Sequence, residues 1–381
     1  MTVERALPTP EARELLELVA EVAREKLAPK AAEAERAGAF PRDVFKTIGQ
    51  MGLLGLPYAE KYGGAQLPYE VYLQVVEELS SAWLTVGLGV SVHTLSCFAL
   101  ARYGDDEQRE RWLPGMLGGE LLGAYCLSEP DSGSDAAALR SRAVATGDGF
   151  RLDGTKAWIT HAGEADFYTV MARTSDDGAR GISCFLVPAD ATGVVAAARE
   201  RKMGLKASPT AQLHLADVRI ESNRLIGELG QGFPIALAAL DTGRLGIAAC
   251  AVGLAQAALD VAVDYAGQRR QFGRTIGDFE GLAFMLADMA TGVAAARALY
   301  LAAACRLDRN QPVTKEAAMA KLFCTDVAMR VTTDAVQVLG GYGYVEDYPV
   351  ERYLREAKAL QIVEGTNQVQ KLVISRQLRP Q

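Results

Sequence analysis

The sequence predicts a mainly α-helical protein with a central β domain. Alanine-rich and leucine-rich segments with helical spacing occupy both ends of the chain, whereas short β-rich runs with Asp-Gly turns occupy the middle. The length of 381 residues exceeds what one ordinary hydrophobic core holds, which indicates two or three domains. We therefore expect an N-terminal α-helical domain (1–120), a middle antiparallel β-barrel-like domain (121–229) and a C-terminal four-helix bundle (230–381).

The first region has clear signals for helix starts. Thr9-Pro10-Glu11 combines a capping hydroxyl, a proline in the first turn and an acidic residue near the helix dipole. Leucines and valines then follow at helical spacing until Pro29, where we expect this helix to end. Further helices are expected to begin near Pro41 and Pro68, and another to span Asp105 to Leu117.

The second region changes to β-rich sequence. Asp148-Gly149 and Asp153-Gly154 are predicted to be hairpin turns. The runs from Phe167 to Arg173 and from Ile182 to Val187 are predicted strands. From Gln212 to Ile220 the alternation of apolar residues slips by one position, which predicts a β-bulge.

The third region is helical again. The segment from Ile235 to Ala266 is apolar nearly all round, so we expect it to be buried. Two more long helices are expected over Phe279 to Leu307 and Thr314 to Leu339, followed by Tyr348 to Ala359 and Thr366 to Leu378. Long helices joined by short loops predict a bundle.

Composition argues against several classes of function. The net charge of −7 gives no electrostatic attraction for nucleic acid. The longest purely apolar run, Leu245 to Ala255, is short of a membrane span, and the N-terminus has no apolar signal core. Six scattered cysteines and three distant histidines show no zinc-site or HExxH spacing. We therefore expect a cytoplasmic protein with no metal, no nucleic-acid partner and no membrane association.

Glu364 is the strongest single candidate for catalysis. It follows the apolar run Leu360 to Val363 and precedes Gly365, so its carboxylate is poorly solvated. Burial raises the pKa of a carboxyl group toward neutrality, where it can act as a general base. A helix that begins near Thr366 opposes this rise by about 0.3–1 kcal/mol, whereas desolvation shifts a pKa by up to about 3–5 units. The alternative is a solvated glutamate in the loop before the last helix.

Four other clusters combine polar, aromatic and glycine residues. They are Tyr125 to Asp135, Trp158-Ile159-Thr160, Arg269 to Arg274 and Gln337 to Tyr344. Each alone has a structural explanation, such as a turn, a packed tryptophan or a helix end. The sequence contains no GxSxG elbow, Walker A loop or complete dinucleotide loop, and Gly230-Gln231-Gly232 is best explained as a linker turn.

Taken in this order over the whole chain, these clusters resemble the acyl-CoA dehydrogenase family. The residues that carry the resemblance are Cys126 to Glu129 with Ser134-Asp135, Trp158 to Thr160, Arg269 to Gly273, Gln337 to Gly341, and Glu364 to Thr366. The resemblance implies non-covalently bound FAD and a homotetramer built as a dimer of dimers. The family fold agrees with the three regions described above.

The resemblance also implies a reaction, the α,β-dehydrogenation of an acyl-CoA thioester to the trans-2-enoyl product in fatty acid β-oxidation. Glu364 would remove the α-proton while the β-hydrogen leaves as hydride to flavin N5. The N–H of Glu364 and a ribityl hydroxyl would bind the thioester oxygen. An electron-transfer flavoprotein would be the acceptor. The alternatives are an oxidase of the same fold that uses oxygen, and a CoA-binding protein that has lost catalysis.

Other site residues follow from the resemblance by position. Contacts with the flavin are expected from Tyr125, Leu127, Ser128, Ser134, Trp158, Ile159 and Thr160. The FAD of a neighbouring subunit would be reached by Arg269, Gln271 and Phe272, and completed by Gln337, Gly341, Thr366 and Gln368. Substrate contacts are expected from Ser134, Asp241, Arg244 and Gly365.

Two departures from the family pattern bear on these roles. Some relatives place the base one residue before the arginine of the long helix, where this chain has Gly243, so Glu364 has no rival. Where many members have glutamine near the FAD diphosphate, this chain has Glu280, which as a carboxylate only accepts hydrogen bonds. The segment Asp241 to Arg244 is most similar to short-chain members, although the acyl chain length stays open.

Overall fold

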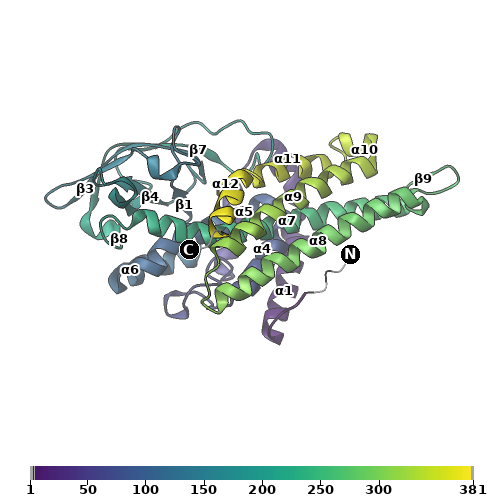
Figure 1. Cartoon of the computed structure of the whole chain (residues 1–381), viewed down its shortest axis with the longest axis horizontal. Helices are drawn as coiled ribbons and strands as arrows, with labels where there is room; N and C mark the ends of the chain where they lie inside the picture. Colours follow the sequence, from purple (N-terminus) through teal and green to yellow (C-terminus); the bar gives the residue numbers. More distant parts are fainter. Residues whose placement is uncertain (1–2, 4, 379–381) are drawn as a thin grey trace.

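The computed structural model describes residues 3 and 5–378, with a β unit at one end of a long helical body (Figure 1). Helix α1 (Pro10–Val22) begins as predicted, because Thr9 Oγ1 accepts a hydrogen bond from Ala12 N at 3.2 Å. The expected helix end at Pro29 is wrong. A π-helical turn, Ala23–Leu27, leads directly into α2 (Ala28–Ala37), and Pro29 lies in the first turn of α2, where its missing N–H costs nothing.

The remaining helices of the first region confirm the predicted starts. Helices α3 (Arg42–Gln50), α4 (Tyr69–Ala82) and α6 (Asp106–Leu117) begin directly after Pro41, Pro68 and Asp105. At α6 the Asp105 carboxylate accepts from Gln108 N at 2.7 Å and the Gln108 side chain accepts from Asp105 N at 2.9 Å. Helix α5 (Leu84–Tyr103) is buried along almost its whole length.

The middle region is a mixed sheet rather than an antiparallel one. Its strands are β1 (Gly123–Cys126), β2 (Arg142–Ala145), β3 (Gly149–Thr160), β4 (Phe167–Arg173), β5 (Ile182–Pro188), β6 (Val194–Ala196), β7 (Thr210–Glu221) and β8 (Leu225–Ile226). Strand β1 pairs with β4 in parallel. Parallel strands need a long connection between them, and here the connection contains β2 and β3. In the order β6-β7-β3-β2-β4-β5-β8 the end strands β6 and β8 each pair on one side only, so the described strands form no closed barrel.

The two predicted Asp-Gly turns have different outcomes. Asp148-Gly149 forms the predicted turn into β3, and Thr146 N donates to Gly149 O at 2.9 Å. Asp153-Gly154 is not a turn, because it lies inside β3 where the pairing with β7 shifts register. The extra residue is on β7 at Ala216–Asp217, which confirms the predicted bulge. A Cβ at Gly154 would lie 2.2 Å from Ser141 Oγ, so close packing explains this glycine.

The third region confirms the predicted helices to within a few residues. They are α7 (Gly232–Gln268), α8 (Glu280–Asp308), α9 (Thr314–Leu339), α11 (Val350–Leu360) and α12 (Asn367–Gln377). A short helix that was not predicted, α10 (Gly341–Tyr344), follows α9, and a short hairpin, β9 (Arg270–Gln271) and β10 (Arg274–Thr275), joins α7 to α8. Helices α7, α8 and α9 lie side by side, and α11 packs on α7 and α9 (Figure 1). The helical character is confirmed, whereas a regular four-helix bundle is not.

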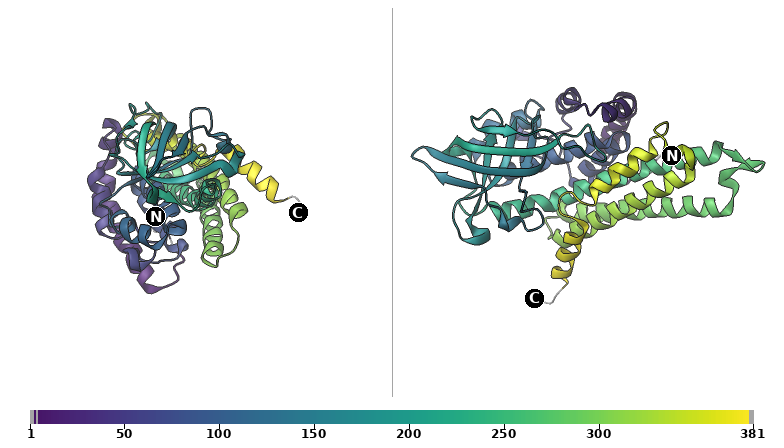
Figure 2. Two further views of the ribbon diagram at one scale, coloured as in Figure 1. Left: turned by 90° about the vertical axis from the view of Figure 1, so that its left-hand side faces the viewer. Right: turned by 90° about the horizontal axis from the view of Figure 1, so that it is seen from above.

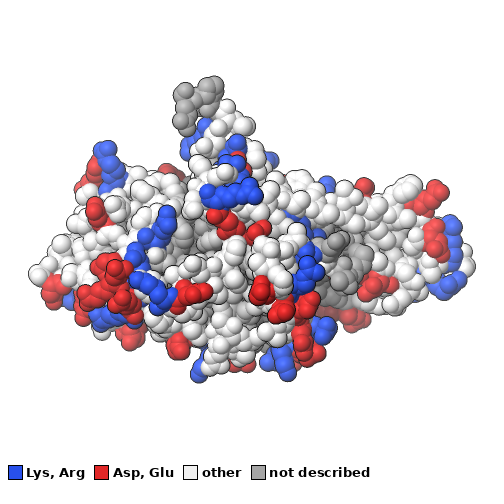
Figure 3. All heavy atoms as spheres, turned by 90° about the horizontal axis from the view of Figure 1, so that it is seen from below, with Lys and Arg blue, Asp and Glu red and all other residues white. Residues whose placement is uncertain are grey.

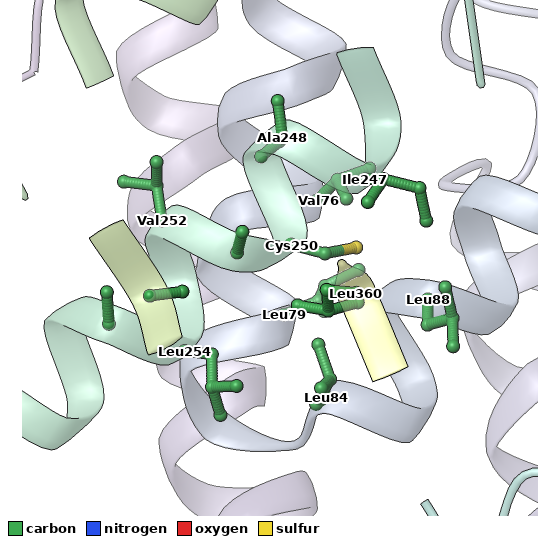
Figure 4. Packing of buried hydrophobic residues seen from close by; sticks show 14 of the residues in the cluster. Val76, Leu79, Leu84, Leu88, Ile247, Ala248, Cys250, Val252, Leu254 and Leu360 are labelled. Atoms are coloured by element: carbon green, nitrogen blue, oxygen red, sulfur yellow. The ribbon is translucent and has the colours of Figure 1, made fainter. Parts of the chain in front are cut away.

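The main hydrophobic core is centred on α7, as the apolar sequence of this helix predicted. Figure 4 shows α4, α5, α7 and α11 meeting there through small and branched side chains: Val76, Leu79, Leu84, Leu88, Ile247, Cys250, Leu254 and Leu360. Leu360 is fully buried and is the last residue of α11. The loop that carries Glu364 therefore begins from a firmly packed residue.

Three helices have the length and composition of a membrane span, namely α5, α7 and α8. Packing inside the protein explains two of them, because 89% of the apolar window in α5 and 78% of that in α7 is buried. Only 22% of the window in α8 is buried. Helix α8 therefore presents an apolar face to solvent in the single chain.

The C-terminal helix α12 stands out from the body of the protein (Figures 2 and 3). Asn367 and Gln370, at its start, are its only buried residues among those described. Leu372 and Leu378 are exposed. Most of α12 is therefore held through its first turn alone.

Candidate active site

The candidate base lies in a sharp turn between α11 and α12. Glu364 and Gly365 both have left-handed backbone conformations, with φ of 52° and 91°. For glutamate this conformation is strained by about 1–3 kcal/mol, and such strain persists where the surroundings impose it. Thr366 then caps α12, because its Oγ1 accepts from Val369 N at 3.3 Å. The turn fixes where the carboxylate of Glu364 points.

The carboxylate of Glu364 is buried although part of the residue is exposed. Neither of its oxygens has a hydrogen-bond partner among the described residues. Burial raises the pKa of Glu364 to about 7, and the nearby positive charges of Lys321 and Arg244 oppose that rise. A Cβ at Gly243 would lie 2.0 Å from Glu364 Oε2, so only glycine leaves room for the carboxylate here. The alternative of a solvated loop glutamate is therefore wrong.

Titratable groups from three elements lie close enough to interact electrostatically with this carboxylate. Its negative charge contributes to the raised pKa values of Tyr72 on α4, Tyr125 on β1 and Cys250 on α7, for all of which burial is the larger cause. The Tyr125 hydroxyl donates to Ala236 O at 3.3 Å. The carboxylate thus faces a region enclosed by helices on one side and the first strand of the sheet on the other.

The predicted substrate residues on α7 lie in the same region. Arg244 is buried, and its Nη1 donates to Asp241 Oδ1 at 2.7 Å. Thr314 Oγ1 donates to the other carboxylate oxygen of Asp241 at 2.5 Å. Burial raises the pKa of Asp241 in spite of these two contacts. The Nε of Arg244 is buried with no partner among the described residues, so a polar group of a ligand would satisfy it.

Lys321 is a site residue that the sequence reasoning missed. This lysine of α9 is fully buried, and its Nζ donates to Gly365 O and to Asn367 Oδ1, both at 2.9 Å. Burial lowers the pKa of Lys321 to about 7, and the charge of Glu364 opposes that change. A signal was present, because Lys321 shares a helix face with Ala317 and Cys324, both fully buried.

The predicted flavin loop is tied to the end of β3 by a buried ion pair. Lys156 Nζ donates to Glu129 Oε1 at 2.8 Å and to Leu127 O at 3.2 Å. The Ala157 N–H donates to Ser128 O at 2.9 Å. The Glu129 carboxylate also accepts from the N–H groups of Arg140 and Ser141, at 2.6 and 2.9 Å. Two of the sequence clusters therefore form one rigid unit.

Trp158 is presented in a way that suits a flat ligand. Its side chain is 65% exposed, and its backbone is left-handed with φ of 62°. Its neighbour Ile159 is buried and pairs with Ala211, while Thr160 is half-buried and pairs with Thr210. Ser134, in the loop between β1 and β2, is exposed. An aromatic side chain held out of the core by its neighbours is available to cover a ring.

Most of the remaining predicted FAD residues lie at the far end of the molecule. Arg269, Gln271 and Gly341 line a surface hollow together with Tyr265 and Tyr342. The hairpin beside it points away from the β unit, at the opposite end of the long helices (Figure 1). Phe272 at its tip is 93% exposed, and Gln337 is exposed too, whereas Thr366 and Gln368 begin α12. A single chain therefore does not bring all predicted cofactor residues together.

Two separate parts of the described chain have chemistry that fits different parts of an FAD molecule. The exposed Trp158 suits an aromatic ring system, and the hollow with Arg269 suits an anionic, adenine-containing tail. A Cβ at Gly340 or Gly341 would meet no atom within 4 Å, so this hollow has room for a ligand.

A buried carboxylate with a raised pKa and no hydrogen-bond partner among the described residues is suited to acid–base catalysis. Three family models, described as the N-terminal, middle and C-terminal domains of acyl-CoA dehydrogenase, match residues 9–120, 124–218 and 230–379. The chain belongs to the acyl-CoA dehydrogenase family. It is therefore an oxidoreductase of an FAD-dependent family, which confirms the resemblance.

Individual relatives cover nearly the whole chain. It is 45% identical to an acyl-CoA dehydrogenase of Bacillus subtilis (95% of this chain, 96% of the relative) and 43% identical to a short-chain specific acyl-CoA dehydrogenase of Clostridium acetobutylicum (94% and 95%). The butyryl-CoA dehydrogenase structure from Megasphaera elsdenii matches with a TM-score of 0.96 and 39% identity (99% and 100%). A chain from a structure on the electron transferring flavoprotein of Acidaminococcus fermentans matches with a TM-score of 0.97 and 42% identity (99% and 100%).

A second glutamate with a raised pKa lies away from these residues and serves as a comparison. Glu356 on α11 is buried, its pKa is raised to about 8 by burial and by the charge of Glu35, and Arg352 approaches its Oε1 at 3.6 Å. Glu35 is itself held by the Trp83 indole N–H at 3.0 Å and by the Ala207 N–H at 3.1 Å. Neither Glu356 nor Glu35 is among the charged groups that shift the pKa of Glu364.

Glu356→Gln is expected to stabilise the protein at high pH. The pKa of Glu356 lies above its unfolded value of about 4.3, so ionisation costs stability progressively as the pH rises from about 4 to about 8. Glutamine removes that cost, which we expect to raise the free energy of unfolding on the order of 2–5 kcal/mol at pH 9. Urea unfolding at pH 4.5 and pH 9 measures it. An equal change at both pH values contradicts the prediction.

Proposed function

We propose that this protein catalyses the FAD-dependent α,β-dehydrogenation of an acyl-CoA thioester to the trans-2-enoyl-CoA, with Glu364 as the base. One observation carries the proposal: both oxygens of Glu364 are buried with no hydrogen-bond partner in the part of the chain that the structure describes, beside a glycine that leaves them room. A carboxyl group with a pKa of about 7 is about half ionised at neutral pH. It therefore accepts a proton readily from an acidified carbon.

The turn that carries the base also provides a donor for the substrate. Among the described hydrogen bonds, the N–H of Glu364 has no acceptor. We assign it to the thioester carbonyl oxygen, where charge develops as the α-proton leaves. Arg244 and Lys321 favour the carboxylate form of Glu364 before the proton transfer. FAD, when bound, supplies the hydride acceptor.

The far hollow supports a role in a neighbouring subunit. The hairpin with Arg269, Gln271 and Phe272, and the junction of α9 and α10 with Gln337 and Gly341, lie at the opposite end of the helical body from the β unit that carries Trp158 (Figure 1). The apolar face of α8 is also left exposed by the single chain. Both features support a homotetramer in which these residues, with Thr366 and Gln368, complete the FAD site of a second copy.

The relatives support a short acyl chain and a protein acceptor. One of them is named short-chain specific and a matching structure is a butyryl-CoA dehydrogenase. We therefore assign butyryl-CoA as the preferred type of substrate. The match to a chain from a structure on an electron transferring flavoprotein supports such a flavoprotein as the electron acceptor.

Anaerobic titration of the purified holoenzyme with butyryl-, octanoyl-, palmitoyl- and isobutyryl-CoA tests this function. We expect the yellow flavin absorbance to be bleached fastest by butyryl-CoA, because the similar proteins include a short-chain specific enzyme and a butyryl-CoA dehydrogenase. Reoxidation in air is expected to be slow compared with reoxidation by an electron-transfer flavoprotein. Rapid reoxidation in air indicates the oxidase alternative. A colourless protein, or flavin that no acyl-CoA bleaches, contradicts the proposal.

A further inference from the structure

Lys321 is a buried cation that the proposed reaction does not itself use. It lies on α9 with no exposed surface, in a segment where its neighbours on the same helix face are alanine and cysteine. Burying a lysine side chain is costly unless the charge is paired or hydrogen-bonded. Such a residue in a site therefore needs a physical reason.

The hydrogen bonds of Lys321 all end on the segment that carries the base. Two of its three N–H donors go to Gly365 O and to Asn367 Oδ1, both at 2.9 Å. Gln370 Nε2 donates to the same Gly365 oxygen at 2.8 Å and to Glu364 O at 3.3 Å. The carbonyls on either side of the strained turn are therefore held from two helices, α9 and α12.

The charge of Lys321 is not neutralised by a contacting carboxylate. Among the described residues no acidic side chain forms an ion pair with its Nζ. Asp326, one turn further along α9, is engaged by Asn367 Nδ2 at 2.7 Å and by Gln361 Nε2 at 2.6 Å. The charged groups that act on Lys321 are Glu364, Asp326 and Arg244. Glu364 is first among those that favour its charge.

Arg244 alone is a weaker source of positive charge for Glu364. Its guanidinium donates to Asp241 at 2.7 Å, so part of its field is cancelled locally. The other titratable groups around the base, Tyr72, Tyr125 and Cys250, are neutral at pH 7 because burial raises their pKa values. Lys321 is thus the cation best placed to favour the carboxylate form.

We infer that Lys321 is a positioning residue for the base: it fixes the segment from Glu364 to Asn367 through its hydrogen bonds to Gly365 O and Asn367 Oδ1, and it favours the ionised carboxylate through its charge. The inference rests on the proposed function, in which Glu364 must be ionised to accept the α-proton. Both parts act through Glu364, so Lys321 need not touch substrate or flavin. Asn367 and Gln370 share the positioning part but carry no charge.

Three substitutions separate the two parts. Lys321→Gln keeps a hydrogen-bond donor but removes the charge. Lys321→Met keeps a long side chain but removes both the donor and the charge, and Lys321→Arg keeps the charge. We expect the pH profile of flavin bleaching by butyryl-CoA to move upward by about 1 unit in Lys321→Gln and Lys321→Met, because the opposite charge is lost. This shift lowers the rate about fivefold at pH 7 and leaves it recoverable at pH 9 in Lys321→Gln. Lys321→Arg should retain the wild-type profile.

A second readout does not depend on turnover. The infrared band of the protonated Glu364 carboxyl group, assigned by its loss in Glu364→Gln, should titrate about 1 unit higher in Lys321→Gln than in the wild type. The matched control is Lys202→Met. Lys202 is a partly buried lysine whose pKa burial likewise lowers, and it donates to Ser208 O at 2.7 Å. We expect that control to leave both titrations unchanged.

The outcomes distinguish this inference from the proposed function. If the wild-type flavin is not bleached by any acyl-CoA, the proposed function fails, whatever Lys321 does. If the wild type is bleached but the Lys321 variants lose rate equally at every pH, or keep both titrations in place, the role of Lys321 is only structural and the inference is overturned. Flavin content and thermal unfolding of each variant show whether it is folded, and the infrared titration still applies to a folded variant with low activity.

Discussion

We expect Glu364→Gln to lower the rate of flavin reduction by butyryl-CoA about 10²–10⁴-fold while FAD stays bound. An amide has nearly the same shape as the carboxyl group but does not accept the α-proton at neutral pH. The substitution also removes a buried ionisable group with no hydrogen-bond partner, so the fold should not suffer. Anaerobic stopped-flow spectroscopy of the flavin band measures the rate.

The control for this experiment is Glu356→Gln, the same exchange at the other buried glutamate with a raised pKa. We expect its bleaching rate to match that of the wild type. The wild-type rate should rise with pH through about 7, because the ionised form of Glu364 is the reactive one. If Glu364→Gln is bleached at the wild-type rate, another residue is the base and Glu364 has no catalytic role.

Local signals in the sequence were sufficient for most helix boundaries. Thr9, Pro41, Pro68 and Asp105 each mark a helix start through capping or through the fixed φ of proline, and these effects act over three or four residues. The bulge in β7 was also predictable, because a bulge changes which residues face the core and so shifts the apolar alternation.

Features set by contacts between distant segments were not predictable. The π-helical turn at Ala23–Leu27 lets the chain pass Pro29 without a break, and no local pattern marks it. Asp153-Gly154 has the composition of a turn, but Ser141 and β7 hold it inside a strand. The parallel pairing of β1 with β4 depends on topology rather than on either strand's own sequence.

The candidate site shows the same division between local and distant information. Glu364 was predicted from its immediate neighbours, which the structure supports through the buried, unpaired carboxylate. Lys321 was missed because its partners, Gly365 and Asn367, lie more than forty residues further along the chain. The roles of the other predicted flavin and substrate residues stay predictions that the substitutions above begin to test.

Glu77→Ala is expected to lower the free energy of unfolding by about 3–5 kcal/mol, the largest effect on stability that we predict. Glu77 on α4 is buried and joins two distant arginines. Its carboxylate pairs with Arg297 of α8 at 2.9 Å and with Arg5 at 3.1 Å, and it accepts from the Tyr300 hydroxyl at 2.5 Å. Alanine leaves the largely buried Arg297 without its counter-ion, and Arg5 with Glu78 alone, whose carboxylate its Nη2 approaches at 2.5 Å.

The location of Glu77 explains why the effect should be large. The network joins the N-terminal segment, α4 and α8, so it holds the outermost long helix on the rest of the protein. Glu25→Ala is the matched control, because Glu25 pairs with Arg24 at 3.5 Å on the surface, where such pairs contribute about 0–1 kcal/mol. Urea unfolding of both variants makes the comparison. Equal losses of stability mean that the buried network adds nothing beyond an ordinary surface pair, and that α8 is held by apolar packing alone.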